Sequence, residues 1–252
     1  MSLAVQTISG ANLDFQQERG DLACAFRWTA RLNMNEGVAN HFSLAVDDAG
    51  QRFLINPAGK HFSRIKASDL IVVDALDPAS IDRPDAPDRT AWALHGAVHR
   101  QAPHARCIVH VHSKYATVLA TLKDPTIPPI DQNTMRFYER IAVDTGYDGM
   151  GLGDEAERVA ALVGDKPVLV MGNHGVMIFA PTVAHAFDEL YYFERACETY
   201  ITALMTGQPL AIASHEVASK TRDQWVEVLD DAFLHMSELH GILSDEGSNY
   251  LS

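Results

Sequence analysis

The sequence predicts a single α/β domain in which a mostly antiparallel sheet is flanked by helices. Short apolar, β-branched runs are joined by brief turn clusters, as at 41–55, and that pattern indicates antiparallel hairpins. Between these runs lie segments with apolar residues every three or four positions, which predict helices that pack on the sheet. The chain has 252 residues, 47% of them hydrophobic, which is enough to bury a sizeable core.

The first half of the chain alternates between these two patterns. A weakly structured lead over 1–14 is expected to precede the first helix. Prolines and aspartates mark 77–88 as an exposed loop rather than a domain boundary, because the apolar pattern resumes at once. The elements expected in this half are a helix over 15–33, a hairpin over 40–55, a strand over 70–74, a helix over 90–101 and a strand over 106–112.

The second half is expected to be richer in helices. Ser113 is expected to cap a helix that reaches about 123, and Thr182 to cap the longest helix, which ends near Gly207. Glu194 lies on the apolar stripe of that helix, where a carboxylate is costly unless paired, so an internal hydrogen bond or ion pair is its simplest explanation. The other expected elements are a helical piece over 134–141, a glycine-rich loop over 146–153, a helix over 154–163, strands over 167–171 and 176–179, and a helix over 222–240 followed by a frayed tail after 245.

Charge and composition argue against several classes of function. The net charge of −13 argues against a surface for nucleic acid or anionic membranes, although local basic residues can still line a site for an anionic substrate. Three cysteines lie far apart in apolar segments, which is typical of reduced thiols in a cytoplasmic protein. No signal peptide is expected, because the N-terminus has no basic region followed by an apolar run. No membrane span is expected, because no apolar stretch approaches about 18 residues.

Two histidines share one face of the strand predicted over 106–112. Side chains alternate along a strand, so His110 and His112 point the same way, about 7 Å apart, and can converge on one metal ion. The alternative is a pair of hydrogen-bonded core histidines. His174 lies in a tight turn where Gly175 allows a backbone conformation that a Cβ would resist. Together the three histidines match a site with an open position, which is typical of catalytic metals.

Five segments, taken in order, resemble the class II aldolase/adducin family. They are Asn40–Ser43 (NHFS), Ile55–Asp74 (INPAGKHFSRIKASDLIVVD), His95–His112 (HGAVHRQAPHARCIVHVH), Gly172–Phe179 (GNHGVMIF) and Thr182–Tyr200 (TVAHAFDELYYFERACETY). Each is weak alone, but five in order are specific. The resemblance covers about 18–205, and residues 1–252 are expected to form one domain of this family with a C-terminal helix at about 222–240.

The resemblance implies a three-layer α/β fold, in which the central, mostly antiparallel sheet lies between layers of helices. Members usually assemble as tetramers with sites between subunits, so a homotetramer is expected. They carry a divalent metal on three histidines, which correspond to His110, His112 and His174. The resemblance implies zinc as that metal, with manganese, cobalt or iron as alternatives.

The sequence departs from the sugar-phosphate aldolases of the family at two parts of their site. Their general acid/base carboxylate corresponds to Ala91. Two serines of their phosphate pocket correspond to Arg89 and Thr90, and a Gly-Asn pair that helps bind phosphate corresponds to Asn40-His41. The metal ligands are therefore retained, while the phosphate site and the proton-transfer carboxylate are not, so the substrates of those aldolases do not carry over.

Other residues are candidates for the chemistry that these departures remove. His41 can serve as acid/base in place of the missing carboxylate, with a structural role at the sheet edge as the alternative. Arg89 either holds a substrate carboxylate or is a solvated loop cation. Tyr115 is a third catalytic candidate, and His95 is expected in or behind the site. The residues expected to bind substrate are Asn40, Gly59 and Asn173.

The sequence therefore predicts a metal-dependent carbon–carbon lyase. A divalent metal with an open position stabilises an enolate, which both retro-aldol cleavage and decarboxylation generate from a small carboxylated hydroxy or keto compound. Decarboxylation is slightly favoured, because it needs mainly the electron sink, whereas retro-aldol cleavage also needs the base that is missing at Ala91. The alternatives are an aldolase with another base and a non-catalytic, adducin-like interaction domain, against which the retention of all three histidines argues.

Overall fold

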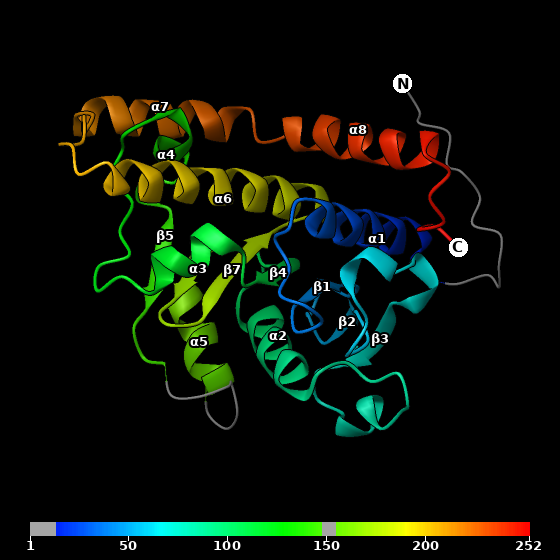
Figure 1. The fold of residues 1–252 in the computed structure, drawn as a ribbon. Coiled ribbons are helices and arrows are strands. Elements are labelled where there is room, and N and C mark those ends of the chain that lie inside the picture. Colours follow the sequence, from blue (N-terminus) through cyan, green and yellow to red (C-terminus); the bar gives the residue numbers. More distant parts are fainter. Residues whose placement is uncertain (1–13, 148–154) are drawn as a thin grey trace.

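The structure is a computed structural model that describes residues 14–147 and 155–252 (Figure 1). The weakly structured lead expected over 1–14 and the loop expected over 146–153 lie almost entirely outside the described residues. Among the helices in the described ranges, none is both long and apolar enough to cross a membrane.

A mixed sheet forms the centre of the described structure. Its seven strands run in the spatial order β3-β2-β1-β4-β7-β6-β5. All neighbouring strands are antiparallel except β5 and β6, which are parallel, so the expected mostly antiparallel sheet is confirmed. The strands are β1 His41–Ala45, β2 Arg52–Ile55, β3 Ile71–Asp74, β4 Cys107–Val111, β5 Ile141–Asp144, β6 Val168–Met171 and β7 Gly175–Ala180.

Helices cover both faces of this sheet, as the three-layer expectation requires (Figure 1). The helices α1, α3, α6 and α8 contribute to one apolar core against the sheet, whereas α2 and α5 pack on the opposite face. The helices are α1 Gln16–Arg31, α2 Arg89–Gln101, α3 Lys114–Ala120, α4 Gln132–Arg136, α5 Glu155–Val163, α6 Val183–Met205, α7 His215–Glu227 and α8 Asp231–Asp245, with short 3-10 turns η1 Phe62–Arg64, η2 Ala67–Asp69 and η3 Pro78–Ile81.

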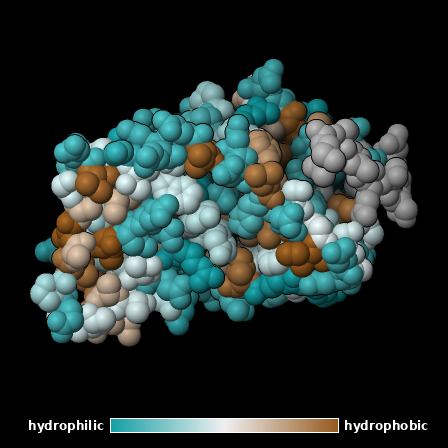
Figure 2. All heavy atoms as spheres, turned by 90° about the horizontal axis from the view of Figure 1, so that it is seen from above, coloured by the Kyte–Doolittle hydropathy of each residue, from teal (hydrophilic) through white to brown (hydrophobic). Residues whose placement is uncertain are grey.

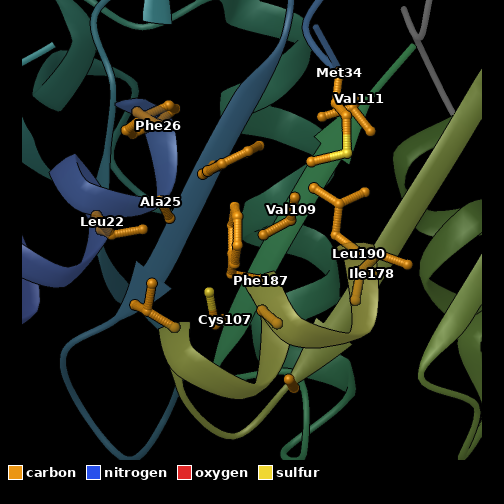
Figure 3. Close-up of a cluster of buried hydrophobic side chains, with 14 of the residues drawn as sticks. Leu22, Ala25, Phe26, Met34, Cys107, Val109, Val111, Ile178, Phe187 and Leu190 are labelled. Carbon is orange, nitrogen blue, oxygen red and sulfur yellow. The ribbon is translucent and has the colours of Figure 1, made fainter. Parts of the chain in front are cut away.

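The side chains of the central strand β4 alternate between the two layers of helices. Figure 3 shows Cys107, Val109 and Val111 pointing into the core that α1 and α6 form. Their apolar side chains are fully buried there. Ile108 packs instead in the core of α2 and α5, and His110, two residues further on, shares that face of the sheet. The alternation expected from the sequence is therefore observed.

One strand was not expected from the sequence. The helical piece predicted over 134–141 is wrong at its end, because α4 stops at Arg136 and β5 begins at Ile141. The run from Ile141 to Val143 is too short to reveal its period, and it forms a strand only because it pairs in parallel with β6. Such pairing cannot be recognised in a local pattern.

The C-terminal region also differs from the prediction. The single helix expected over 222–240 is instead two helices, α7 and α8; in Figure 1, α7 lies above α6 and α8 lies above α1. They pack on different partners: Trp225 of α7 donates to the carbonyl of Gln132, and the carbonyl of Leu239 in α8 accepts from Trp28. The tail after 245 is not frayed, because the amide of Ala67 donates to the Tyr250 carbonyl at 2.8 Å and the Tyr250 side chain is buried.

Glu194 determines how the chain leaves β4. The prediction that Ser113 caps α3 is wrong, because the Ser113 hydroxyl makes no cap hydrogen bond and donates instead to Glu194 at 2.6 Å. The same carboxylate accepts from the backbone amides of Tyr115 at 2.9 Å and Ala116 at 3.0 Å. The expected internal hydrogen bond of Glu194 is thus confirmed, and it fixes the first turn of α3 directly after the histidine strand.

Candidate metal centre

Three histidines meet where the end of β4 lies beside the turn between β6 and β7. His110 is in β4, His112 follows its last residue, and His174 lies in the turn. Strand pairing aligns Val111 with Val176, which brings the turn to the end of β4. The ring centroids are 4.9 Å apart in all three pairs, and one ligand nitrogen of each ring lies within 4.8 Å of the others. We call His110, His112 and His174 the three-histidine cluster.

Gly175 brings the turn close to the strand, but not for the expected reason. Its backbone is not in the left-handed region, which Asn173 occupies instead with a φ of 57°. A Cβ on Gly175 would lie 2.6 Å from the carbonyl oxygen of Val111 and 2.7 Å from the His112 ring. Glycine is therefore required because the two backbones approach so closely, and this approach places His174 opposite the strand histidines.

The hydrogen bonds of His110 fix which of its nitrogens is free. Its Nδ1 lies 3.0 Å from the carbonyl oxygen of Val176, which can only accept, so Nδ1 carries the proton and Nε2 keeps its lone pair. That Nε2 lies 3.0 Å from Nε2 of His112. Two nitrogens bound to one tetrahedral metal at the usual zinc–nitrogen distance are about 3.3 Å apart, so this spacing suits a shared ion.

The three rings have the protonation state that metal ligation needs. Burial, followed by the neighbouring histidines, lowers the pKa of His110 well below its usual value. Burial lowers the pKa of His112 to about 4 and also lowers the pKa of His174. Nδ1 of His174 is buried without a hydrogen-bond partner among the described residues. Three neutral imidazoles with free lone pairs therefore fit a divalent metal such as zinc.

His41 lies directly beside the three-histidine cluster. It pairs with His110 across β1 and β4, and the two rings stack with centroids 4.8 Å apart. Its Nδ1 lies 2.7 Å from Nε2 of His95. Burial lowers the pKa of His41 to about 3, and the carboxylate of Asp88 opposes this shift. His41, which was predicted from the sequence as a catalytic candidate, therefore lies beside the three-histidine cluster, while its chemical role stays a prediction.

Comparison with known proteins now assigns the family. A family model described as "Class II Aldolase and Adducin N-terminal domain" matches residues 20–201. The chain belongs to the class II aldolase and adducin family. It is 30% identical over 204 residues to a putative aldolase class 2 protein of Caulobacter vibrioides, covering 80% of this chain and 78% of the relative.

Two further comparisons bear on this family member. The decarboxylase NovR of Streptomyces niveus is 26% identical over 204 residues, covering 80% of this chain and 75% of the relative. The crystal structure of an aldolase II superfamily protein from Pseudomonas syringae superposes with a TM-score of 0.84 at 28% identity, covering 96% of this chain and 98% of that one. These similarities confirm the three-layer fold and the family inferred from the sequence motifs.

Asn40 is the best-placed substrate-binding candidate of this family member. Its side chain is buried, and its Oδ1 accepts from the amide of Glu36 at 2.6 Å and, more weakly, from that of His112 at 3.5 Å. Both donors are backbone amides, which fixes the orientation of the Asn40 carboxamide. Its Nδ2 is buried without a partner in the described part of the chain, so it remains available to donate to a bound molecule.

The remaining candidates of this class II aldolase family member lie at different distances from the cluster. Arg89 is the exposed first residue of α2, next to Asp88, whose charge acts on His41. Gly59 and Asn173 are exposed, with φ values of 74° and 57°. Tyr115 lines a cavity between α3 and α6 with Tyr191 and Glu194, and no described contact joins it to the three histidines.

Sequence reasoning missed two residues at the site. Asp88 caps α2 by accepting from the amides of Thr90 at 2.8 Å and Ala91 at 3.2 Å, and an Asp directly before a helix was the signal that could have found it. Tyr147 follows β5, a strand that was not expected, and its ring centroid lies 6.0 Å from that of His174. No signal in the sequence indicates that contact.

Proposed function

We propose that this family member is a metal-dependent carbon–carbon lyase that decarboxylates a small hydroxy or keto acid. The observation that carries the proposal is the convergence of three neutral histidines. It is combined with Ala91 at the position that corresponds to the carboxylate of the sugar-phosphate aldolases. Ala91 is fully buried in an apolar cluster with Phe53 and Ile55, so the first turn of α2 offers no acid/base group there. Decarboxylation needs an electron sink more than it needs such a group.

In the proposed decarboxylation, different residues of the protein would bind the metal and the substrate. His110, His112 and His174 would hold the metal, which supplies the positive charge that stabilises the electron pair left on carbon. Nδ2 of Asn40 can donate to a substrate oxygen. Arg89, exposed at the start of α2, can pair with the substrate carboxylate before that group leaves as carbon dioxide. The carbon then takes one proton from solvent, which balances the reaction.

His41 supports a second candidate reaction, retro-aldol cleavage. A neutral His41 ring whose Nδ1 donates to His95 keeps a lone pair on Nε2, which can accept a proton. Retro-aldol cleavage needs an acceptor for the substrate hydroxyl proton, which moves to the base as the carbon–carbon bond breaks and an aldehyde or ketone forms. In decarboxylation the same nitrogen would only accept a hydrogen bond from a substrate hydroxyl or from water. Product analysis distinguishes the two reactions.

We also propose that the protein works as a cytoplasmic homotetramer. The three cysteines are buried and carry free thiols, which supports a reducing compartment. Figure 2 shows apolar side chains on the face that α7 and α8 form, and an interface between subunits would cover them. The exposed apolar residues of these two helices and the turn between them are Val217, Val226, Val228, Phe233, Leu234 and Ile242.

The test combines metal loading with a product screen. The purified chain is depleted of metal, reloaded with zinc, manganese, cobalt or iron, and incubated with panels of keto acids, hydroxy-aromatic acids and hydroxy acids. Metal-dependent release of carbon dioxide is expected from one panel, and it is expected to disappear in His112→Ala but not in His215→Ala, a control histidine on the distant helix α7. Metal-dependent release of an aldehyde without carbon dioxide would favour the aldolase. Neither product with any loaded metal would overturn the lyase proposal.

A further inference from the structure

A chain of buried hydrogen bonds leads from His41 to a backbone carbonyl. Nδ1 of His41 lies 2.7 Å from Nε2 of His95, and Nδ1 of His95 lies 2.5 Å from the Ser43 hydroxyl. That hydroxyl lies 2.7 Å from Nε2 of His99, whose Nδ1 lies 2.8 Å from the carbonyl oxygen of Ala105. All four side chains are buried. We call His41, His95, Ser43 and His99 the histidine chain.

Secondary structure brings the four side chains together. His41 and Ser43 are two residues apart in β1 and therefore share one face of the sheet, opposite Phe42, which faces the core of α1 and α6. His95 and His99 are four residues apart in α2 and share the helix face that packs on this side of the sheet. The histidine chain thus crosses the boundary between the sheet and α2, and its first ring, that of His41, stacks on His110.

The carbonyl at the end of the chain sets the direction of every hydrogen bond. The oxygen of Ala105 can only accept, so Nδ1 of His99 carries the proton and Nε2 of that neutral ring accepts from the Ser43 hydroxyl. Ser43 has a single hydroxyl proton, so its oxygen must accept from Nδ1 of His95.

The proton on Nδ1 of His95 also sets the direction of the hydrogen bond to His41. Because Nδ1 of His95 is the donor to Ser43, Nε2 of that neutral ring accepts from Nδ1 of His41. Nε2 of His41 then keeps a lone pair, and no hydrogen-bond partner for it is found within the described ranges.

Neutral rings are required for this assignment, and burial provides them. Burial lowers the pKa of His99 to about 4 and lowers the pKa of His95 well below its usual value. The chain also ends at a carbonyl in the protein interior, so it has no outlet through which a proton could leave. Because every hydrogen bond behind the His41 ring is satisfied, the network fixes the orientation of that ring.

We infer that Ser43, His95 and His99 are positioning residues that lock His41 in the Nδ1–H tautomer and leave the lone pair of its Nε2 free, on a ring that lies beside the three-histidine cluster. The value of this arrangement for catalysis rests on the proposed function, because only a reaction at the cluster would use that lone pair. The tautomer itself does not depend on any activity and can be measured separately.

Histidine-selective 15N NMR of the full-length, zinc-loaded chain measures the tautomer directly. Protonated and unprotonated ring nitrogens have well-separated 15N shifts, and the His41 signals are identified by their absence in His41→Asn. The expected spectrum of the unchanged protein shows a protonated Nδ1 and an unprotonated Nε2 at His41, His95 and His99. A protonated Nε2 at His41 would overturn the inference without any variant.

His99→Phe should invert the chain. The new ring keeps the packing on Phe53, whose centroid is now 5.2 Å from that of His99, but it removes the acceptor of the Ser43 proton. Ser43 then donates to Nδ1 of His95, which moves the proton of His95 to Nε2 and makes Nδ1 of His41 an acceptor. The proton of His41 is expected to move to Nε2, and Ser43→Ala should give a mixture of the two tautomers.

The control is Tyr250→Phe, which removes a hydroxyl 2.6 Å from Nδ1 of His240 in another part of the fold. It should leave the His41 signals unchanged. Unchanged His41 signals in folded His99→Phe and Ser43→Ala would also overturn the inference. If the reaction proves to be retro-aldol cleavage, in which His41 takes the substrate proton, kcat of His99→Phe should fall at least about 100-fold with metal content unchanged. If no substrate is found, the spectra still decide the tautomer, so the two proposals fail separately.

Discussion

The three-histidine cluster and the histidine chain lie next to each other on one face of the sheet, yet their hydrogen bonding differs. In the chain each ring nitrogen has a partner among the described residues, apart from Nε2 of His41. In the cluster Nε2 of His110 meets another Nε2, and Nδ1 of His174 has no partner within the described ranges. Burying a polar atom without a partner is costly. The unpaired nitrogens of the three-histidine cluster therefore indicate that this cluster, rather than the histidine chain, binds a ligand.

The largest expected effect separates the two groups by metal content. His110→Ala removes the most buried member of the cluster and should abolish stoichiometric zinc binding, because two imidazoles hold zinc far more weakly than three. His99→Phe removes a member of the histidine chain and should retain zinc. Metal analysis after gel filtration measures both variants. Equal zinc content in the two variants would contradict the claim that the three-histidine cluster binds zinc and the histidine chain does not.

We expect the free energy of unfolding to decrease at acid pH, because the histidine chain is buried in its neutral form. The pKa of His99 falls by burial from 6.5 to about 4, so below pH 6.5 the unfolded chain binds a proton that the folded chain refuses. Above pH 6.5 the burial of His99 has no effect of this kind on the free energy of unfolding. As the pH falls from 6.5 toward 4, the free energy of unfolding decreases by on the order of 3 kcal/mol because of this residue. Urea unfolding of the metal-free protein at pH 7 and pH 5 should therefore show a smaller loss in His99→Phe. A loss as large as that of the unchanged protein would contradict this assignment.

A methyl group at Gly175 should disturb the cluster without touching a ligand. Gly175→Ala places a Cβ 2.6 Å from the Val111 carbonyl, and that backbone cannot move cheaply. We expect a loss of about 2 kcal/mol in the free energy of unfolding and weaker zinc binding. Gly241→Ala is the matched control, because a Cβ there in α8 meets nothing within 4 Å and alanine favours a helix. Equal stability of the two variants would mean that the close approach does not hold the turn in place.

The smallest expected effect concerns the support behind the cluster. Glu194→Gln replaces one acceptor oxygen by an amide, so one of the donors from Ser113, Tyr115 and Ala116 loses its partner. We expect the free energy of unfolding to fall by about 1 kcal/mol. Glu198→Gln breaks only an exposed pair with Arg195 and should change stability by less than about 0.5 kcal/mol. The order of the two denaturation midpoints checks the role of the half-buried Glu194 as a cap.

Periodicity and caps predicted much of this fold because both act locally. The alternation of β4 places His110 and His112 on one face, and Thr182 caps α6 by accepting from the amide of His185. The cluster itself needed the turn around His174, which a glycine-rich pattern indicated. Family motifs added the expectation that the distant segments meet at one site.

Contacts between elements that are far apart in the sequence could not be predicted from local sequence patterns. His41 and His95 are 54 positions apart, and nothing in the sequence near either residue shows that their nitrogens meet. The buried Arg136 likewise pairs with Asp188 and Glu189 from another helix. The tail around Tyr250 is held by contacts with the turn near Ala67 and with His240 of α8. Such features depend on tertiary packing rather than on propensity.

The most direct measurement of the central claim is the metal stoichiometry of the full-length chain after depletion and reloading. Three neutral imidazoles that converge from β4 and the neighbouring turn should bind one equivalent of zinc per chain. Mass spectrometry of the native protein and elemental analysis both count the bound ion. One equivalent is the expected result, whereas less than about a tenth of an equivalent with every divalent metal tried would contradict the metal centre and the lyase function built on it.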